Sequence, residues 1–101
     1  MYGTIFRIKV NPGKEKEVAN AFKEWDRQRK PKVKGVVAGF LLKPDGEAPE
    51  NYIGVAVFRD KASYMANAND PEQDAWYQKI RKLLKADPVW HDGEFVAGGV
   101  A

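Results

Sequence analysis

Two stretches decide the fold: residues 33–43, VKGVVAGFLLK, and residues 52–58, YIGVAVF. A strand presents alternate side chains to opposite faces of its sheet. In the first stretch Phe40 and Leu42 share one face and Leu41 lies on the other, so both faces are apolar. The second stretch has the same pattern. An antiparallel sheet with one face in water would alternate apolar and polar residues, so these two strands are expected to be covered on both faces.

The neighbouring segments predict two more strands and a first helix. Residues 2–10 alternate in polarity, which is typical of a strand, and residues 89–97 form the last predicted strand. Asn11 is expected to cap the helix that follows the first strand, with Pro12 as its first residue. Pro31 is expected to end that helix, because proline cannot continue the backbone hydrogen bonding.

The segment between the third and fourth strands predicts a helix in two parts. Asp60 is a candidate cap for a short first part. Asp70, Pro71 and Gln73 have the spacing of a cap, a first helical residue and a capping-box partner for the second part. The element order is therefore β-α-β-β-α-β. It predicts an α+β, ferredoxin-like fold with an antiparallel sheet, helices on one face and a broken second helix.

Length and composition narrow the class of protein. A chain of 101 residues predicts a single domain over residues 1–101. The absence of cysteine excludes disulfides and thiol nucleophiles, and a single histidine excludes a multi-histidine metal site within one chain. No apolar stretch approaches the roughly 18 residues of a membrane span. Arg7 and Lys9 stand where a secretion signal would be apolar, so we expect a cytoplasmic protein without membrane contact.

The second face of the predicted sheet requires a cover. Helices on one side can shield only one face, and the other would leave an apolar patch of a kind that monomers rarely expose. A second copy of the chain, packed sheet against sheet, would cover it, which predicts a homodimer. The alternative is that the tail, residues 97–101, folds over this face. Five small residues cover little area, so the homodimer is preferred.

Four motifs give the chain a family resemblance: 10–14 (VNPGK), 58–60 (FRD), 69–77 (NDPEQDAWY) and 87–94 (DPVWHDGE). On these motifs nearly the whole chain resembles the antibiotic-biosynthesis-monooxygenase-like group of the dimeric α/β-barrel superfamily. The resemblance implies two chains whose sheets join into a barrel, with a pocket between helices and sheet in each. Some members of that superfamily oxidise phenolic or quinol-type substrates with O2 and no cofactor, and others degrade haem.

The haem-degrading relatives use an Asn on the first strand, a Trp in the first part of the broken helix and a His in the second. The corresponding positions here fall near Phe6, Asn67 and Tyr77, and none carries the matching residue. The only histidine, His91, lies on the last predicted strand instead. The resemblance therefore argues against haem ligation, and no cofactor is predicted.

The predicted site is an aromatic-lined slot. Gly54 and Ala56 are small residues on one strand face and would leave a void between larger side chains. The candidate substrate-binding residues are Phe6, Phe58, Tyr64 and Trp76. The candidate catalytic residues are Tyr77 and Asn67, as hydrogen-bonding groups, and His91, as a base of the type that titrates near neutral pH. The alternatives are that the aromatic residues only fill the core and that His91 lies at the surface or the dimer interface.

These observations predict a cofactor-independent monooxygenase-like protein whose partner is a small aromatic molecule, phenolic or quinone-type. The alternative is a non-catalytic small-ligand-binding or structural dimer of the same fold. The basic residues 27–34 could contact phosphate, but they mark a helix C-terminus, where cations suit the dipole. They are therefore interpreted as a solvated basic stretch, and no nucleic acid partner is predicted. Asp92 and Glu94 lack a third ligand, so no metal site is predicted.

Overall fold

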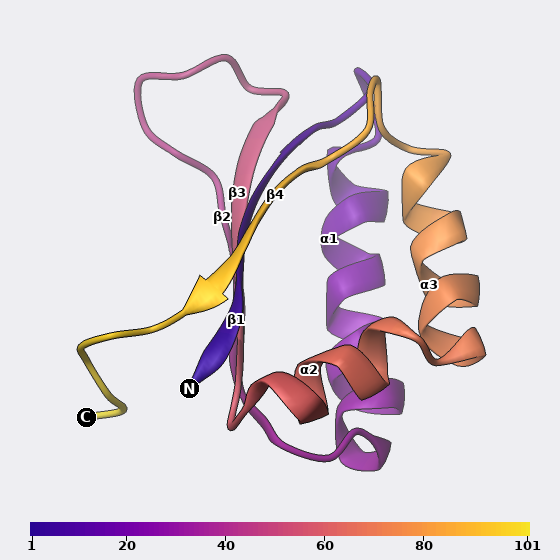
Figure 1. The fold of residues 1–101 in the computed structure, drawn as a ribbon. Helices are drawn as coiled ribbons and strands as arrows, with labels where there is room; N and C mark the ends of the chain where they lie inside the picture. The colour runs from indigo at the N-terminus through magenta and orange to yellow at the C-terminus, as the bar shows by residue number, and fades with distance from the viewer.

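The computed structural model describes all residues 1–101 and shows a four-stranded sheet with helices on one face (Figure 1). The elements are β1 (Tyr2–Lys9), α1 (Glu15–Glu24), β2 (Val36–Leu42), β3 (Asn51–Phe58), α2 (Lys61–Ala68), α3 (Pro71–Arg81) and β4 (Val89–Glu94). The strand order is β2-β3-β1-β4, and each neighbouring pair is antiparallel. The predicted ferredoxin-like α+β order with a broken second helix is confirmed. None of the helices has the length and apolar character that crossing a membrane demands.

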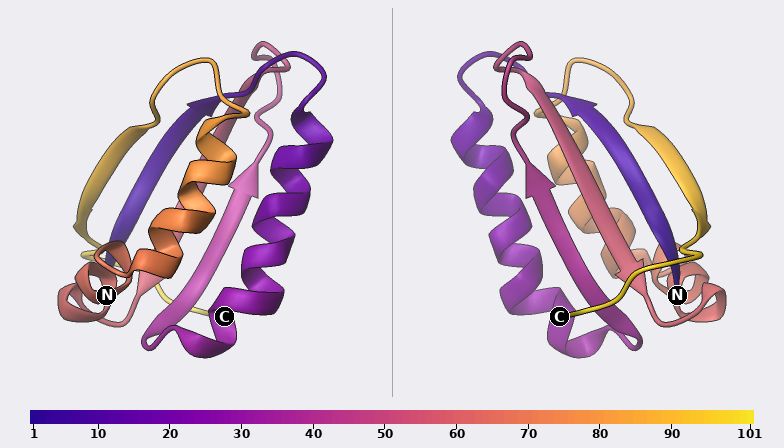
Figure 2. Two further views of the ribbon diagram at one scale, coloured as in Figure 1. Left: turned by 90° about the vertical axis from the view of Figure 1, so that its right-hand side faces the viewer. Right: turned by 90° about the vertical axis from the view of Figure 1, so that its left-hand side faces the viewer.

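The hydrophobic core lies between β1 and the two longer helices. Alternate residues of β1 point to this side, and Phe6 and Ile8 are buried there. Val18 of α1 and Ile80 of α3 pack against them as the apolar stripes of amphipathic helices. Figure 2 shows α1 and α3 crossing the same face of the sheet. The other face therefore carries no helix.

The caps of the broken helix follow the sequence. Asp60 accepts a hydrogen bond from a backbone N–H three residues later, at 2.8 Å, and α2 begins after it. Asp70 accepts from the N–H two residues later, at 2.9 Å, and Pro71 is the first residue of α3. The capping-box role expected for Gln73 is wrong, because its side chain accepts a hydrogen bond from the Trp25 indole instead.

The first helix begins later than predicted. Asn11 does not cap a helix, and Pro12 is not a helical residue, because the chain makes a turn there. Gly13 adopts φ of 81°, in the left-handed region that interrupts a right-handed helix. The helix α1 therefore begins at Glu15.

The end of the first helix is also different. The chain passes from α1 into a π-helical segment, Trp25–Arg29, and then into a 3-10 turn, Lys30–Lys32, which contains Pro31. Short π-helical segments interrupt the regular hydrogen bonding of a helix and often occur at functional sites. The outer strands are shorter than predicted: β2 begins at Val36, and β4 ends at Glu94.

The outer face of the sheet is apolar and exposed in the single chain. Phe40 and Leu42 of β2 are 70% and 56% exposed, and Ile5 of β1 is exposed beside them on the same face. The tail after β4 runs away from the sheet in Figure 1, and Val96 is 92% exposed. The alternative that the tail covers this face is therefore wrong. Phe95, just after β4, lies with its ring near Gly3 of β1.

The contact between Gly54 and Phe6 yields a first prediction. A Cβ atom placed on Gly54 would lie 1.9 Å from Cζ of Phe6, so Gly54→Ala forces the ring or the strand to move. Overpacking of this kind costs about 1–3 kcal/mol. We expect the free energy of unfolding, measured by urea denaturation, to fall by that amount.

The matched control is Gly39→Ala on β2, where the nearest atom to a new Cβ is a carbonyl oxygen at 3.7 Å. Its free energy of unfolding should change by no more than about 0.5 kcal/mol. Equal stability of the two variants would contradict the close packing of Phe6 over Gly54.

Candidate functional site

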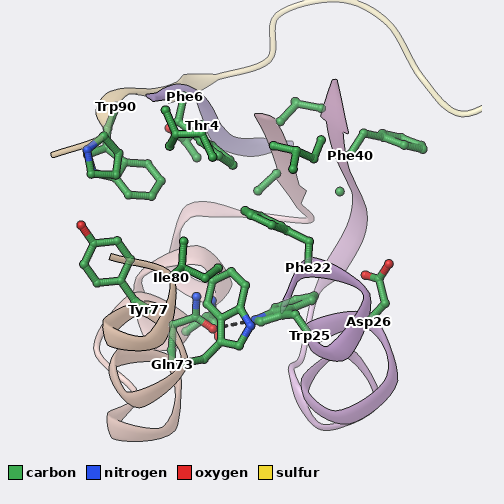
Figure 3. Close-up of a pocket in the computed structure, with 18 of the residues that line it drawn as sticks. Thr4, Phe6, Phe22, Trp25, Asp26, Phe40, Gln73, Tyr77, Ile80 and Trp90 are labelled. Atoms are coloured by element: carbon green, nitrogen blue, oxygen red, sulfur yellow. Dashed lines mark hydrogen bonds between the residues drawn. The ribbon is translucent and has the colours of Figure 1, made fainter. Parts of the chain in front are cut away.

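A cavity of about 730 Å³ lies between the helices and the inner face of the sheet. Twenty of its 30 lining residues are hydrophobic, and this volume and character suit a small organic molecule. The large aromatic residues of the wall come from strands and helices alike: Phe6, Phe22, Trp25, Tyr52, Phe58, Tyr64, Trp76, Tyr77 and Trp90. Phe40 of the edge strand β2 borders the cavity as well. Figure 3 shows several of these side chains around the space between the elements.

The aromatic wall is held by ring-to-ring packing. Phe6 lies 5.1 Å from Trp90 of β4 and 6.1 Å from Phe22 of α1, measured between ring centroids. Trp76 of α3 meets Phe22 edge to face at 5.2 Å, and its indole N–H donates to the carbonyl oxygen of Ala21 at 2.9 Å. Edge-to-face and tilted ring pairs fix the orientation of each ring. The helices and the sheet therefore share one rigid apolar wall.

The π-helical segment joins this wall to α3. The Trp25 indole N–H donates to Oε1 of Gln73 at 2.7 Å, the dashed line in Figure 3. Asp26 of the same segment and Asp74 of α3 also line the cavity. Polar and charged groups thus stand on the helix side of a mostly apolar space.

The strongest polar contact on the sheet side joins Tyr64 to Asp92. The Tyr64 hydroxyl donates to Oδ1 of Asp92 at 2.9 Å, and both residues line the cavity. Burial and the neighbouring Asp92 carboxylate raise the pKa of the Tyr64 phenol, so it stays protonated at neutral pH. Asp92 is a cavity residue that was not among the predicted site residues. Its signal was strand alternation, because Asp92 shares a face with Trp90.

Tyr77 supplies a second phenol from α3. Its ring lies 6.3 Å from that of Trp90, and Figure 3 shows the two next to each other on one side of the cavity. Burial, and to a lesser extent the charge of Asp87, raises the pKa of the Tyr77 phenol. The Tyr77 hydroxyl makes no hydrogen bond within the chain. It is therefore a protonated donor that is free to bind a ligand.

Asn67 reaches the cavity from α2 and is held by a buried arginine. Arg29 is only 8% exposed, and its Nη2 donates to Oδ1 of Asn67 at 2.9 Å. Its Nη1 donates to Glu72 at 2.9 Å, and Asp70 lies 3.5 Å from Nη2. The interpretation of residues 27–34 as a solvated basic stretch is therefore wrong for Arg29, because this side chain joins the two parts of the broken helix.

The structure brings together six of the seven predicted site residues: Phe6, Phe58, Tyr64, Asn67, Trp76 and Tyr77. The void expected above Gly54 is absent, because the Phe6 ring fills it, and Ala56 lines the cavity in its place.

His91 is the exception among the predicted site residues. It pairs with Ile5, so strand alternation turns it to the outer face. There it lines a small separate hollow with Ile5 and Gly93. His91 therefore does not line the cavity, and the prediction that it acts there as a base does not fit its position in the chain.

Comparison with known proteins agrees with this geometry. The sequence pattern of the family described as antibiotic biosynthesis monooxygenase matches residues 1–79. No curated protein matches the chain.

Solved structures share the fold at low sequence identity. A protein of unknown function from Nitrosomonas europaea, NE2512, is 22% identical with a TM-score of 0.79, over 99% of this chain and 93% of its own. SnoaB from Streptomyces nogalater, described as a cofactor-independent oxygenase and solved as an asparagine-to-alanine mutant, is 15% identical with a TM-score of 0.81, over 96% and 94%. A conserved protein from Methanosarcina mazei Go1 is 15% identical with a TM-score of 0.79, over 91% and 89%.

Identities this low show a common fold and no more. The family assignment comes from the sequence match, which spans most of the chain and covers β1 through most of α3. It agrees with the resemblance found in the four motifs. The chain belongs to the antibiotic biosynthesis monooxygenase family.

Proposed function

We propose that this protein is a cofactor-independent monooxygenase that acts on a small phenolic or quinone-type molecule. The observation that carries the proposal is the cavity of about 730 Å³, which is mostly apolar and has a few polar groups at fixed places. Family membership supports the reaction class. The description of SnoaB as a cofactor-independent oxygenase supports it further. A cytoplasmic location stays a prediction.

The proposed chemistry needs only O2 and the substrate. A phenol that loses its proton can pass an electron to O2, and the resulting radical pair can combine at a ring carbon as a hydroperoxide. Loss of water then leaves a carbonyl, so one oxygen atom stays on the ring and the other leaves as water. The substrate O–H and C–H supply both hydrogens of that water, and the substrate supplies all four electrons that reduce O2: two as the hydroperoxide forms and two as its O–O bond breaks. An apolar site assists because it excludes water and orients the reactants.

The polar groups divide these tasks. Tyr77 and Asn67 are the proposed catalytic residues, because each can donate a hydrogen bond to the substrate oxygen as negative charge develops on it. Asp92 is the proposed proton acceptor in place of His91, because it is a carboxylate on the cavity wall. The proposed substrate-binding residues share a position on the cavity wall: Phe6, Phe58, Tyr64 and Trp76.

Oxygen consumption tests the proposal. We expect the protein to accelerate O2 uptake with at least one member of a panel of hydroquinones and anthrone-type phenols. Tyr77→Phe and Asn67→Ala should each lower kcat/KM by about tenfold or more, because removal of a donor to a developing oxyanion typically has an effect of that size or larger.

The matched controls are Tyr2→Phe and Asn20→Ala, which lie outside the cavity and should retain the rate. Uptake that is absent with every substrate would contradict the proposal, as would site variants that behave like the two controls.

The non-catalytic alternative has its own readout. All three tryptophans of the chain, Trp25, Trp76 and Trp90, line the cavity. Saturable quenching of tryptophan fluorescence by a quinone therefore reports occupancy. Quenching with no O2 uptake across the panel would favour a small-ligand-binding protein of the same fold.

We also propose that two copies of the chain pair through the outer face of the sheet. The exposed Phe40, Leu42 and Ile5 form an apolar surface there that neither helix nor tail shields. In sedimentation at micromolar concentration we expect a species of twice the chain mass of 11.4 kDa. Leu42→Glu places a charge within the paired surface without touching the cavity wall, and it should shift the protein to monomer.

Met65→Glu is the matched control for that experiment, because Met65 is an exposed apolar residue on α2. This variant should sediment like the unaltered protein. A clean monomer without any substitution would rule out the pairing.

A further inference from the structure

Arg29 lies behind the cavity wall, because it is buried but does not line the cavity itself. A buried guanidinium needs partners for its charge and its N–H groups. Its two Nη atoms find them on both parts of the broken helix, in Asn67 on α2 and in Glu72 on α3. Nε has no hydrogen-bond partner, so only the two Nη atoms of the guanidinium bind other side chains. A single side chain of the π-helical segment thus fixes groups on two other elements.

This contact determines the orientation of the Asn67 amide. A guanidinium only donates hydrogen bonds, so the amide must turn its oxygen toward Arg29. The opposite orientation would place two N–H groups against each other. The amide nitrogen of Asn67 is then the free end, and no group of the chain accepts a hydrogen bond from it. This nitrogen is not fully buried, so a ligand can reach it.

We propose that Arg29 is a positioning residue that makes the cavity selective for ligands with a hydrogen-bond-accepting oxygen. By holding the Asn67 oxygen, it presents the Asn67 NH2 group as a donor to a quinone carbonyl or a phenolate. An aromatic hydrocarbon of the same shape gains nothing from that donor. The inference rests on the proposed function for the class of ligand, but it concerns binding and requires no turnover.

Paired ligands test this selectivity. The probes are 1,4-naphthoquinone and naphthalene, which share a ring system and differ in their oxygens, with binding measured by calorimetry on the full chain. The unaltered protein should bind the quinone more tightly. Arg29→Lys keeps the charge beside Glu72 but loses the fork, so it should weaken quinone binding by roughly five- to tenfold. Its affinity for naphthalene should stay within about twofold.

Asn67→Asp gives a second test that keeps the shape of the side chain. The carboxylate can still accept from Arg29 but has no N–H to donate, so quinone preference should fall as in Arg29→Lys. The double variant should show no further loss, because both changes remove the same donor. Glu72→Gln is the control, since it alters another partner of Arg29 outside the cavity and should leave the ratio of the two affinities unchanged.

A purely structural role for Arg29 would weaken both ligands alike in Arg29→Lys and would overturn the inference. Absence of any quinone preference in the unaltered protein would overturn it too. If Arg29→Lys does not fold, Asn67→Asp provides the test instead: a quinone preference that persists in Asn67→Asp would also overturn the inference. A protein that shows the predicted ratios but consumes no O2 would keep this inference and overturn the proposed function.

Discussion

The alternation of side chains along the central strands governs the rest of the molecule. It sends Phe6 and Asp92 to the face that the helices cover, and Ile5 and His91 to the face that they leave open. Both faces are apolar, yet the helices lie on only one of them. One face therefore holds the core and the cavity, and the other requires a partner of its own. A single residue of register shift would exchange the two sets and abolish both surfaces.

The covered face is divided between packing and open space. The buried cluster lies around the end of β1, where Val10, just after the strand, and Val18 of α1 are fully buried and Leu84 pairs with Val10. The cavity occupies the remaining layer, and the break between α2 and α3 frames it with residues from both parts. Only 12 of 101 residues are buried, which fits a domain that leaves one apolar face uncovered and keeps an internal space.

Local patterns account for what could be predicted, and contacts distant in sequence account for what could not. Period-two alternation placed the strands, and the Asp60 and Asp70 caps depend on hydrogen bonds within three residues. The hydrogen bonds of Trp25 to Gln73 and of Arg29 to Asn67 join residues 48 and 38 positions apart. No local pattern reveals such pairs, so the buried arginine looked like a solvated one. The error over His91 could have been avoided from the sequence, because neighbouring residues of a strand point to opposite faces and His91 directly follows Trp90.

The titration of the two phenols constrains how the proposed reaction can begin. Burial raises the pKa of both Tyr64 and Tyr77 above the ordinary value of 10, so both keep their hydroxyl protons at neutral pH and neither supplies a phenolate. Three carboxylates line the cavity: Asp26 and Asp74 stand on the helix side, and Asp92, the proton acceptor that we propose, stands on the sheet side. The Tyr64 hydroxyl occupies one oxygen of Asp92 and leaves the other for a substrate proton. Deprotonation and charge stabilisation would thus fall to opposite walls, with Asp92 on the sheet and Tyr77 on the helix side.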